Sequence, residues 1–284
     1  MFDKVVPTRA YSDVDVLEEI PLPNGDVTEG VVRVGDTVRR PVGPHSALVH
    51  AVLDHLEAVG FAGAPRFLGI DDQGREVLTF IEGEVAGRPH PSWIADEERL
   101  LSLAGLVRAL DDAMIDFGFP DIDTETHPDP PGIPPPQQRT FEFIGHRDIT
   151  PENVVWRDTE AYALIDFDLV RPCSRMLEVQ NALMYWAPLS HPRDRDPDQI
   201  DLDVPRRCRL FADAYGLSRE DRAILIDDLI YGTERSWHLM RDRAERLGGG
   251  WARMWDEGVG DQIRRRREWL LVDGPAVTAA LLAE

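Results

Sequence analysis

The stretch that decides the fold is "IGHRDITPENVVWRDTEAYALIDFDLV", residues 144–170. It contains two short apolar runs rich in β-branched residues, "VVW" and "ALIDF", separated by the polar segment "RDTEAY", and this pattern predicts a β-hairpin. The loop before the first strand and the residues after the second strand of a hairpin lie at the same end. Asn153 precedes the first strand and Asp166 ends the second. We therefore expect these two side chains to face a common point.

The polar residues at that end of the hairpin suit metal-dependent chemistry. Asn153 and Asp166 offer two hard oxygen ligands, as many as a Mg²⁺ site commonly takes from protein while water and phosphate complete its shell. We expect Asp148 beside that metal, where its carboxylate can accept a proton from an incoming hydroxyl group. His146 is expected to brace the loop by hydrogen bonding. An ordinary turn is the competing interpretation of the Asp148 to Asn153 spacing.

The charge balance restricts the partners of the chain. Its 284 residues include 31 Lys and Arg and 52 Asp and Glu, which gives a formal net charge of -21 at pH 7. This charge disfavours nucleic acid and an anionic membrane as partners and favours a cationic small molecule. General solubility and a high-salt habitat explain the charge equally well. Because Lys4 is the only lysine, an internal site that needs a fixed positive charge has to use arginine.

The sequence shows no sign of export or of redox chemistry. Cys173 and Cys208 are the only cysteines and lack metal-ligand spacing, so we expect both to be structural and the compartment to be reducing. The N-terminus has no basic-then-apolar signal pattern, and no apolar run approaches the roughly 20 residues of a membrane helix. We expect a soluble, cytoplasmic protein that does not interact with membranes.

Residues 1–82 predict a small β-rich unit. The turn sequences "NG" and "GD" divide residues 16–41 into two or three antiparallel strands. The segment "PHSALVHAVLDHLEAVGF" has its apolar residues on one helical face and Gly60 as a stop signal. "PRFLGID" and "REVLTFIE" predict two further strands. The expected unit is a five-stranded antiparallel sheet with one helix.

The rest of the chain predicts a second, larger and mainly helical unit. Residues 83–92 contain glycine and proline and are expected to form a hinge or linker. Within 93–284 most segments have apolar residues at helical spacing, and Gly or Pro separates them. The acidic, proline-rich segment 120–140 is expected to be a surface loop. The fold class is therefore α+β, with a bilobal arrangement.

Two motifs carry a resemblance to a known family. "HRDITPEN" together with "IDFD" resembles the catalytic loop and the metal-binding segment of the kinase-like superfamily. Thr150 and Asp168 differ from the lysine and glycine that protein kinases carry there, and no "APE" follows. The chain is therefore more similar to the aminoglycoside phosphotransferase (choline kinase-like) family than to protein kinases. The resemblance extends over roughly residues 20–250.

The resemblance implies a fold, an activity and a set of roles. The fold is the bilobal protein-kinase-like fold, and the activity is transfer of the γ-phosphoryl group of ATP or GTP to a hydroxyl group of an aminoglycoside, an aminosugar or another small cationic metabolite. Asp148 is implied to be the catalytic base, with Asn153 and Asp166 as Mg²⁺ ligands. Glu178 occupies the place of an acidic residue that braces the catalytic loop, and Asp168 is implied to assist the metal or the substrate.

The resemblance also assigns the nucleotide-binding residues. "REVLTFIEG" resembles the hinge between the lobes, so the backbone of Thr79 and Ile81 is implied to bind adenine. "LPNGDVTEG" resembles the loop that covers the nucleotide, where Gly25 and Gly30 would let the backbone approach the phosphates. A plain turn is an equally good interpretation of that segment.

One departure from the family affects nucleotide binding. The family carries a lysine on the third strand paired with a glutamate on the following helix, and Arg39 is the best match to that lysine. Residues 37–53 contain no carboxylate to pair with it, and His50 falls near the expected helical position. Because arginine and lysine are not interchangeable, a catalytically weak or inactive kinase-like ligand-binding protein is the alternative.

The acceptor is expected to bind against the helical unit. Residues 200–260 combine carboxylates with three tryptophans, and Glu234 with Trp237 could hold a cationic group. Solvated helix faces above aromatic core residues are the competing interpretation. The identity of the acceptor and the oligomeric state are left open.

Overall fold

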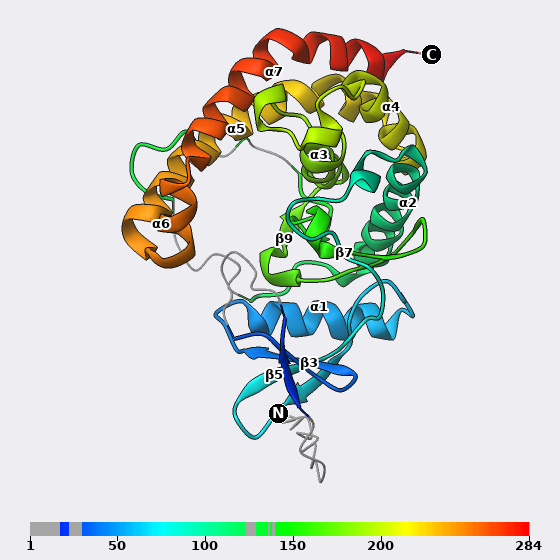
Figure 1. Ribbon diagram of the computed structural model, residues 1–284, viewed down its shortest axis with the longest axis vertical. Helices are drawn as coiled ribbons and strands as arrows, with labels where there is room; N and C mark the ends of the chain where they lie inside the picture. Colours follow the sequence, from blue (N-terminus) through cyan, green and yellow to red (C-terminus); the bar gives the residue numbers. More distant parts are fainter. Residues whose placement is uncertain (1–17, 23–29, 123–128, 136, 138–139, 284) are drawn as a thin grey trace.

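The N-terminal part of the molecule is a five-stranded antiparallel sheet with one helix. The computed structural model describes residues 18–22, 30–122, 129–135, 137 and 140–283. The strands are β1 (Glu19–Pro21), β2 (Val32–Val34), β3 (Thr37–Pro41), β4 (Phe67–Ile70) and β5 (Arg75–Thr79), in the order β1-β2-β3-β5-β4. Helix α1 (Ser46–Ala58) lies between this sheet and the rest of the molecule (Figure 1). The expected sheet and helix are confirmed.

The register of β3 determines which of its arginines faces the rest of the molecule. β3 pairs with β5 so that Arg39 lies opposite Val77 and Arg40 lies opposite Glu76. Successive side chains of a strand point to opposite faces of its sheet. Arg39 and Arg40 therefore point to opposite sides.

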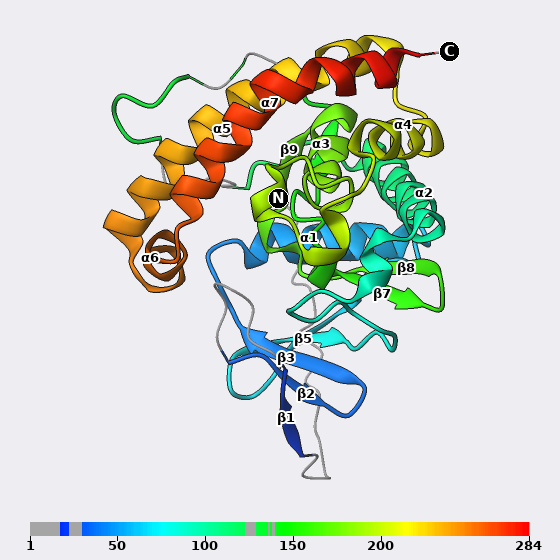
Figure 2. The ribbon, with the colours of Figure 1, turned by 45° about the horizontal axis from the view of Figure 1, so that its top comes forward.

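The C-terminal part is mainly helical, as expected. Its long helices are α2 (Glu97–Met114), α3 (Arg175–Trp186), α4 (Val204–Tyr215), α5 (Arg219–Leu247), α6 (Gly249–Asp256) and α7 (Val259–Leu282). The Ser218 hydroxyl caps α5 by accepting a hydrogen bond from the Asp221 backbone N–H at 3.1 Å. α5 and α7 lie side by side, and α6 lies at one end of this pair (Figures 1 and 2).

Helix α7 continues further than the sequence indicates. Its pattern predicts an end at Gly274, yet the helix passes through Pro275 and ends at Leu282. The buried side chains of Val277 and Leu281 explain this, because their burial offsets the hydrogen bond that a proline removes. Gly274 permits close packing, since a Cβ atom there would lie 2.7 Å from a methyl carbon of Ile226 on α5.

The segment that decided the fold forms the expected hairpin. β7 (Val154–Arg157) and β8 (Glu160–Leu164) are antiparallel, with Val154 opposite Leu164. A second pair, β6 (Phe143–Gly145) with β9 (Arg171–Cys173), flanks the hairpin. This pair was not expected, because three-residue strands are too short to show a period of two.

The linker after β5 is hydrogen-bonded to this hairpin. Glu84 and Trp156 exchange two backbone hydrogen bonds, of 2.9 and 2.7 Å between nitrogen and oxygen. Gly83 packs directly on the hairpin, since a Cβ atom there would lie 2.4 Å from Val155 Cγ1. The domain boundaries 1–82, 83–92 and 93–284 remain predictions. Among the described residues, no helix is long and apolar enough to cross a membrane.

We expect Gly83→Ala to reduce the free energy of unfolding by roughly 1–3 kcal/mol, because the new methyl group would overlap Val155 and the Trp156 carbonyl oxygen. Gly87→Ala is the matched control in the same linker, since a Cβ atom there meets nothing within 4 Å. Urea unfolding of both variants measures the difference. Equal stability of the two variants would contradict the close packing of the linker.

Candidate active site

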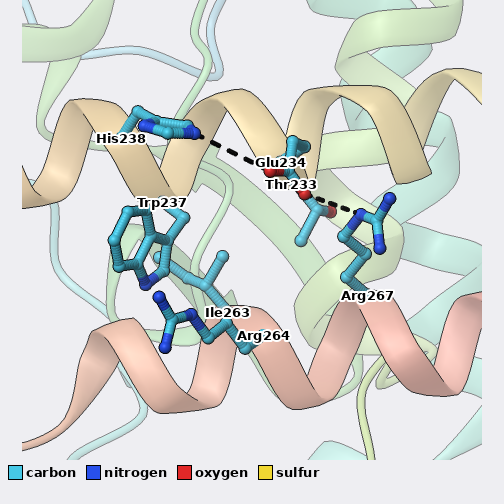
Figure 3. Close-up of a pocket in the computed structure, with 7 residues that line it drawn as sticks. All are labelled: Thr233, Glu234, Trp237, His238, Ile263, Arg264 and Arg267. Atoms are coloured by element: carbon cyan, nitrogen blue, oxygen red, sulfur yellow. Dashed lines mark ion pairs between the residues drawn. The ribbon is translucent and has the colours of Figure 1, made fainter. Parts of the chain in front are cut away.

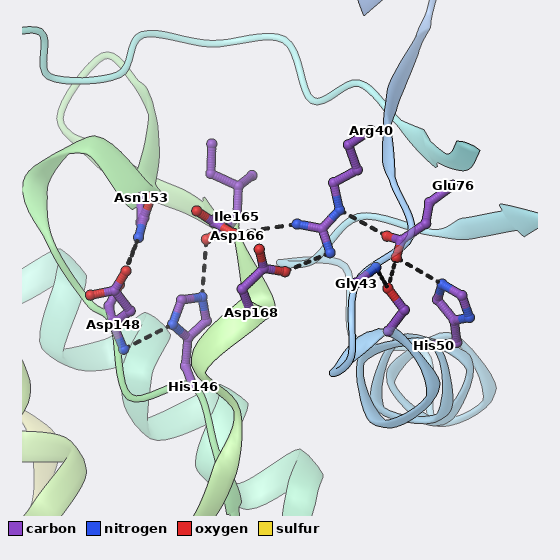
Figure 4. A network of polar contacts seen from close by, with 11 residues as sticks. Arg40, Gly43, His50, Glu76, His146, Asp148, Asn153, Ile165, Asp166 and Asp168 are labelled. Atoms are coloured by element: carbon purple, nitrogen blue, oxygen red, sulfur yellow. Dashed lines mark hydrogen bonds and ion pairs between the residues drawn. The ribbon is translucent and has the colours of Figure 1, made fainter. Parts of the chain in front are cut away.

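The hairpin brings the expected base and metal ligands to one end. Asn153 ends the short 3₁₀ turn η3 (Pro151–Asn153) before β7, and its carbonyl oxygen accepts a hydrogen bond from the Ile165 N–H at 2.9 Å. Asp166 therefore lies close to Asn153. The Asn153 amide Nδ2 donates to Asp148 Oδ2 at 2.8 Å and to the Asp148 carbonyl at 3.0 Å (Figure 4). The Asn153 Oδ1 atom is left to act as a ligand.

His146 braces this loop from within the core. Its Nε2 atom lies 3.0 Å from the Ile165 carbonyl oxygen, and its Nδ1 atom accepts a hydrogen bond from the Asp148 N–H at 3.3 Å. These contacts require a proton on Nε2 and none on Nδ1. Burial lowers the pKa of His146 to about 4, so the ring is neutral at pH 7. In the described structure it holds Asp148 in position and does not face an open site.

Helix α3 holds the other side of the loop. The buried carboxylate of Glu178 accepts hydrogen bonds from the backbone N–H groups of His146, at 2.5 Å, and Arg147, at 3.2 Å. This is the bracing position that the resemblance implied for Glu178. Two further α3 residues, which the sequence did not single out, also hold the loop by hydrogen bonds to Ile149. The Asn181 side chain accepts from the Ile149 N–H at 2.6 Å, and Trp186 Nε1 donates to the Ile149 carbonyl at 3.0 Å.

The donor set around Asp166 fits a divalent cation. Burial raises the pKa of Asp166, and the charges of Asp168 and Asp148 raise it further against the opposing charge of Arg40, to about 7. Carboxylates crowded in this way are stabilised by an added cation. Within the described ranges no group of three or more His, Cys, Asp or Glu residues is arranged to hold a metal by itself. Mg²⁺ needs fewer, because it commonly keeps several waters and binds phosphate oxygens.

Arg40 is the cation that the sheet presents to these aspartates. Its Nη2 atom lies 2.7 Å from Asp168 Oδ1, and its Nη1 atom lies 3.4 Å from Asp166 Oδ1. Its Nε atom pairs with Glu76 Oε2 at 2.8 Å (Figure 4). The sequence had indicated Arg39 for this role. Arg39 instead lies 3.6 Å from Asp71 and donates to Thr37 Oγ1 at 2.6 Å, because it belongs to the other face of β3.

Glu76 supplies the carboxylate partner of the arginine, which residues 37–53 do not contain. It comes from β5 instead of the helix, and it is fully buried. Its Oε1 atom is hydrogen-bonded by the Ser46 hydroxyl and lies 3.5 Å from His50 Nε2. Burial raises the pKa of Glu76, but contacts with His50 and Arg40 outweigh that effect and lower the pKa to about 2. The strand pairing of Arg40 with Glu76 was the signal that could have identified both residues.

The expected adenine-binding segment is only partly open to a ligand. The Thr79 N–H already donates to the Arg66 carbonyl at 3.0 Å, and Thr79 Oγ1 accepts from the Arg66 N–H at 2.8 Å. Ile81 lies beyond the end of β5. In the expected phosphate-covering loop, Gly30 has a positive φ of 80°, which suits glycine. Gly25 lies outside the described residues.

Glu234 and Trp237 line a cavity of about 220 Å³ between α5 and α7 (Figure 3). Arginines already engage both residues. Glu234 Oε2 lies 2.8 Å from Arg267 Nε. The Arg264 guanidinium carbon lies 4.2 Å from the centre of a Trp237 ring. The cavity therefore lacks the free carboxylate and free aromatic face that a cationic group would need.

One curated relative shares substantial sequence with this chain. It is the trifolitoxin immunity protein of Rhizobium leguminosarum bv. trifolii, which is 36% identical over 220 residues that cover 75% of this chain and 80% of the relative. No protein-family model matches the chain.

Solved structures show the fold. The GDP complex of aminoglycoside 2'-phosphotransferase-IIIa matches with a TM-score of 0.57 and 12% identity, over 90% of this chain and 94% of the other. An amicoumacin kinase in complex with AMP-PNP and Ca²⁺ matches with a TM-score of 0.57 and 10% identity, over 93% and 90%. A choline/ethanolamine kinase family protein from Mesorhizobium loti matches with a TM-score of 0.55 and 13% identity, over 95% and 93%. The chain has the protein-kinase-like fold of aminoglycoside phosphotransferases and choline kinase-like proteins, as expected.

We expect Glu76→Gln to lower the free energy of unfolding by roughly 3 kcal/mol at pH 7, because that is the linkage value of a carboxyl pKa lowered from 4.5 to about 2. The folded-state pKa is depressed, so this contribution is complete above pH 4.5 and is lost as the pH falls toward 2. The difference between wild type and variant should shrink over that window in urea unfolding. Glu57→Gln, which removes an exposed carboxylate of α1, is the control. A difference that stays constant from pH 6 to pH 3 would rule out this linkage.

Proposed function

The chain belongs to the family that includes the trifolitoxin immunity protein, and we propose that it is a phosphotransferase. It transfers the γ-phosphoryl group of ATP or GTP to a hydroxyl group of a small molecule. The observation that carries the proposal is the cluster of Asp148, Asn153 and Asp166 at one end of the β7–β8 hairpin. This cluster lies within a fold that nucleotide-binding kinases share.

Asp148 is the proposed catalytic base. Its carboxylate accepts the proton of the acceptor hydroxyl as the oxygen of that group bonds to the γ-phosphorus. The bond between this phosphorus and the bridging oxygen of the β-phosphate breaks, which leaves a nucleoside diphosphate. Hydrogen bonds from Asn153 to Asp148 and from Asp148 to His146 fix the carboxylate before the acceptor arrives.

Asn153 and Asp166 are the proposed Mg²⁺ ligands, and Asp168 lies next to them. The bound ion would neutralise charge on the transferred phosphoryl group. Arg40 would then release part of its contact with Asp166 and turn toward the nucleotide phosphates. Its Nε atom would stay paired with Glu76 during this movement.

The relative's name supports a role in immunity. Phosphorylation of a hydroxyl group would inactivate a toxic small molecule if that group is needed for its action. We extend this role to the present chain, with an aminoglycoside, an aminosugar or another hydroxyl-bearing toxin as the acceptor.

A second candidate function is binding without catalysis. It is favoured by one observation, the direct contacts of Arg40 with Asp166 and Asp168. If these contacts persist when nucleotide is present, the guanidinium takes the place of the metal ion. The chain would then confer immunity by sequestering its ligand.

Scanning fluorimetry with ATP and GTP, each with and without Mg²⁺, tests the proposed function. We expect a Mg²⁺-dependent rise in the melting temperature of wild type that Asp166→Ala abolishes, because the variant lacks a metal ligand. Asp198→Ala, which removes an exposed carboxylate outside the site, should behave like wild type. No shift with either nucleotide would favour the binding protein.

Asp148→Asn separates nucleotide binding, measured by scanning fluorimetry, from catalysis, measured as the rate of phosphate transfer. The variant should keep the nucleotide-dependent shift and lose about 10²–10⁴-fold in the rate of phosphate transfer to an identified acceptor, because it lacks the general base. Full turnover by this variant would remove Asp148 from the mechanism.

The two arginines of β3 should differ in nucleotide binding. Arg40→Gln should weaken binding of Mg²⁺·ATP at least about tenfold, since it removes charge-assisted contacts to phosphate. Arg39→Gln should leave the affinity close to wild type, because Arg39 points toward Asp71. Isothermal titration calorimetry measures both affinities, and circular dichroism verifies folding. A larger loss in Arg39→Gln would restore the assignment made from sequence.

A further inference from the structure

A histidine of the linker joins two carboxylates that come from different parts of the C-terminal unit. His90 Nε2 lies 3.2 Å from Glu152 Oε1, and His90 Nδ1 lies 2.7 Å from Asp196 Oδ2. Glu152 is the middle residue of η3, directly before Asn153, and Asp196 precedes the 3₁₀ turn η6 (Pro197–Gln199). The His90 ring therefore lies between the turn that carries a proposed metal ligand and a second, separate segment.

The geometry of these two contacts determines the charge of the ring. A carboxylate oxygen accepts hydrogen bonds and has no proton to donate, so each ring nitrogen needs its own N–H group. Neutral imidazole has one N–H group only. His90 is therefore an imidazolium cation when both contacts are made, in contrast to the neutral His146. In agreement, the hydrogen bond to Glu152 raises the pKa of His90, and the contact with Asp196 adds to this against the opposing effect of burial.

Two further titratable groups lie near Glu152, and neither replaces His90. Arg88 of the linker pairs with Glu152 Oε1, but its side chain is 61% exposed, so this ion pair contributes little. Tyr185 of α3 stays neutral below pH 10, because burial raises its pKa. The His90 side chain is only 15% exposed, so water and salt screen its contacts less. His90 is therefore the better shielded of the two cations that contact Glu152.

The Asp196 side of this bridge is anchored on α3. The Asp196 carbonyl accepts a hydrogen bond from the Gln199 N–H at 2.9 Å, and the buried Gln199 side chain donates to the Tyr185 carbonyl at 3.0 Å. The same helix carries Glu178, which holds the start of the loop that contains Asp148. His90 thus connects η3, at the end of that loop, to the helix that braces its beginning.

We propose that His90 is a positioning residue of this site. Its imidazolium ring holds η3 and the metal ligand Asn153 in place, and loss of its proton releases η3. Without that proton one ring nitrogen faces a carboxylate as acceptor against acceptor, so one of the two contacts is lost. The effect reaches the base because the Asn153 amide donates to the Asp148 carboxylate. The proposal rests on the proposed function for the role of Asn153, and it adds a pH-dependent control of the site.

Nuclear magnetic resonance of the free protein tests the first step without any ligand. Histidine ring nitrogen shifts followed from pH 5 to pH 9, assigned with His90→Gln, report the protonation of His90. We expect a pKa above the ordinary value of about 6.5, and a lower pKa in Asp196→Asn, which removes one carboxylate charge. The resonance of the Asn153 side-chain amide should shift with the same midpoint in wild type and lose that transition in His90→Gln.

Isothermal titration calorimetry with Mg²⁺·ATP at pH 6 and pH 8.5 tests the second step. Since the pKa of His90 is raised, its contacts are complete below about pH 6.5 and are lost as the pH rises above the folded-state pKa. His90→Arg is the rescue variant, because its guanidinium group keeps its charge and can donate to both carboxylates. Wild type should match His90→Arg at pH 6 and bind about threefold more weakly than this variant at pH 8.5, the effect of one lost hydrogen bond.

Comparison of variants at the same pH removes the effect of other titrating groups, such as Asp166. His191→Gln is the control and should bind like wild type, because His191 Nδ1 accepts from the Arg193 backbone N–H and the ring makes no ion pair with a carboxylate among the described residues.

A His90 pKa at or below 6.5, or an Asn153 resonance that does not follow His90, would overturn the proposal. So would a wild-type affinity that keeps the same ratio to that of His90→Arg at both pH values. Asp196→Asn repeats the comparison if His90→Gln fails to fold. Absence of nucleotide binding in wild type and all variants would instead remove the phosphotransferase assignment, and the resonances of the free protein would still decide whether His90 positions Asn153.

Discussion

The guanidinium group of Arg40 joins the two parts of this molecule at the point where its charges are most crowded. It extends from the sheet to Asp166 and Asp168 beyond the hairpin, and it is anchored on the buried Glu76. One positive charge faces three carboxylates there. Because burial and the neighbouring aspartates raise the pKa of Asp166 to about 7, the site has a deficit of positive charge. A divalent cation is the kind of partner that such a deficit favours.

The arginine that stands where the resemblance implies a lysine is accompanied by differences at other positions. An ammonium group offers one centre of charge, whereas a guanidinium group can hold Glu76 through Nε and the aspartates through its two Nη atoms. The carboxylate partner then comes from the neighbouring strand instead of the helix. His50, which takes the helical position, lies near Glu76 and contributes to its low pKa. Arg40, Glu76 and His50 therefore form one consistent arrangement of contacts.

The sequence predicted the features that depend on local pattern. The hairpin and the five-stranded sheet follow from short apolar runs with turn residues between them, and the helical part follows from its period. It did not identify Arg40, because two adjacent arginines can be told apart only through the register of β3 against β5. Glu76 was missed for the same reason. α7 continues through Pro275, which local pattern does not predict, because tertiary packing of Val277 and Leu281 overrides the signal of the proline.

The loop that holds Asp148 turns at Arg147, so that the side chains of these two consecutive residues reach different parts of the molecule. The Asp148 carboxylate accepts a hydrogen bond from Asn153 at the end of the hairpin, whereas the Arg147 side chain reaches the Leu177 carbonyl on α3. The left-handed backbone of Arg147 makes this change of direction possible at a modest cost in strain. That cost is offset by Glu178 and His146, which fix the backbone on either side of the turn. The buried bracing residues thus determine where the Asp148 carboxylate lies.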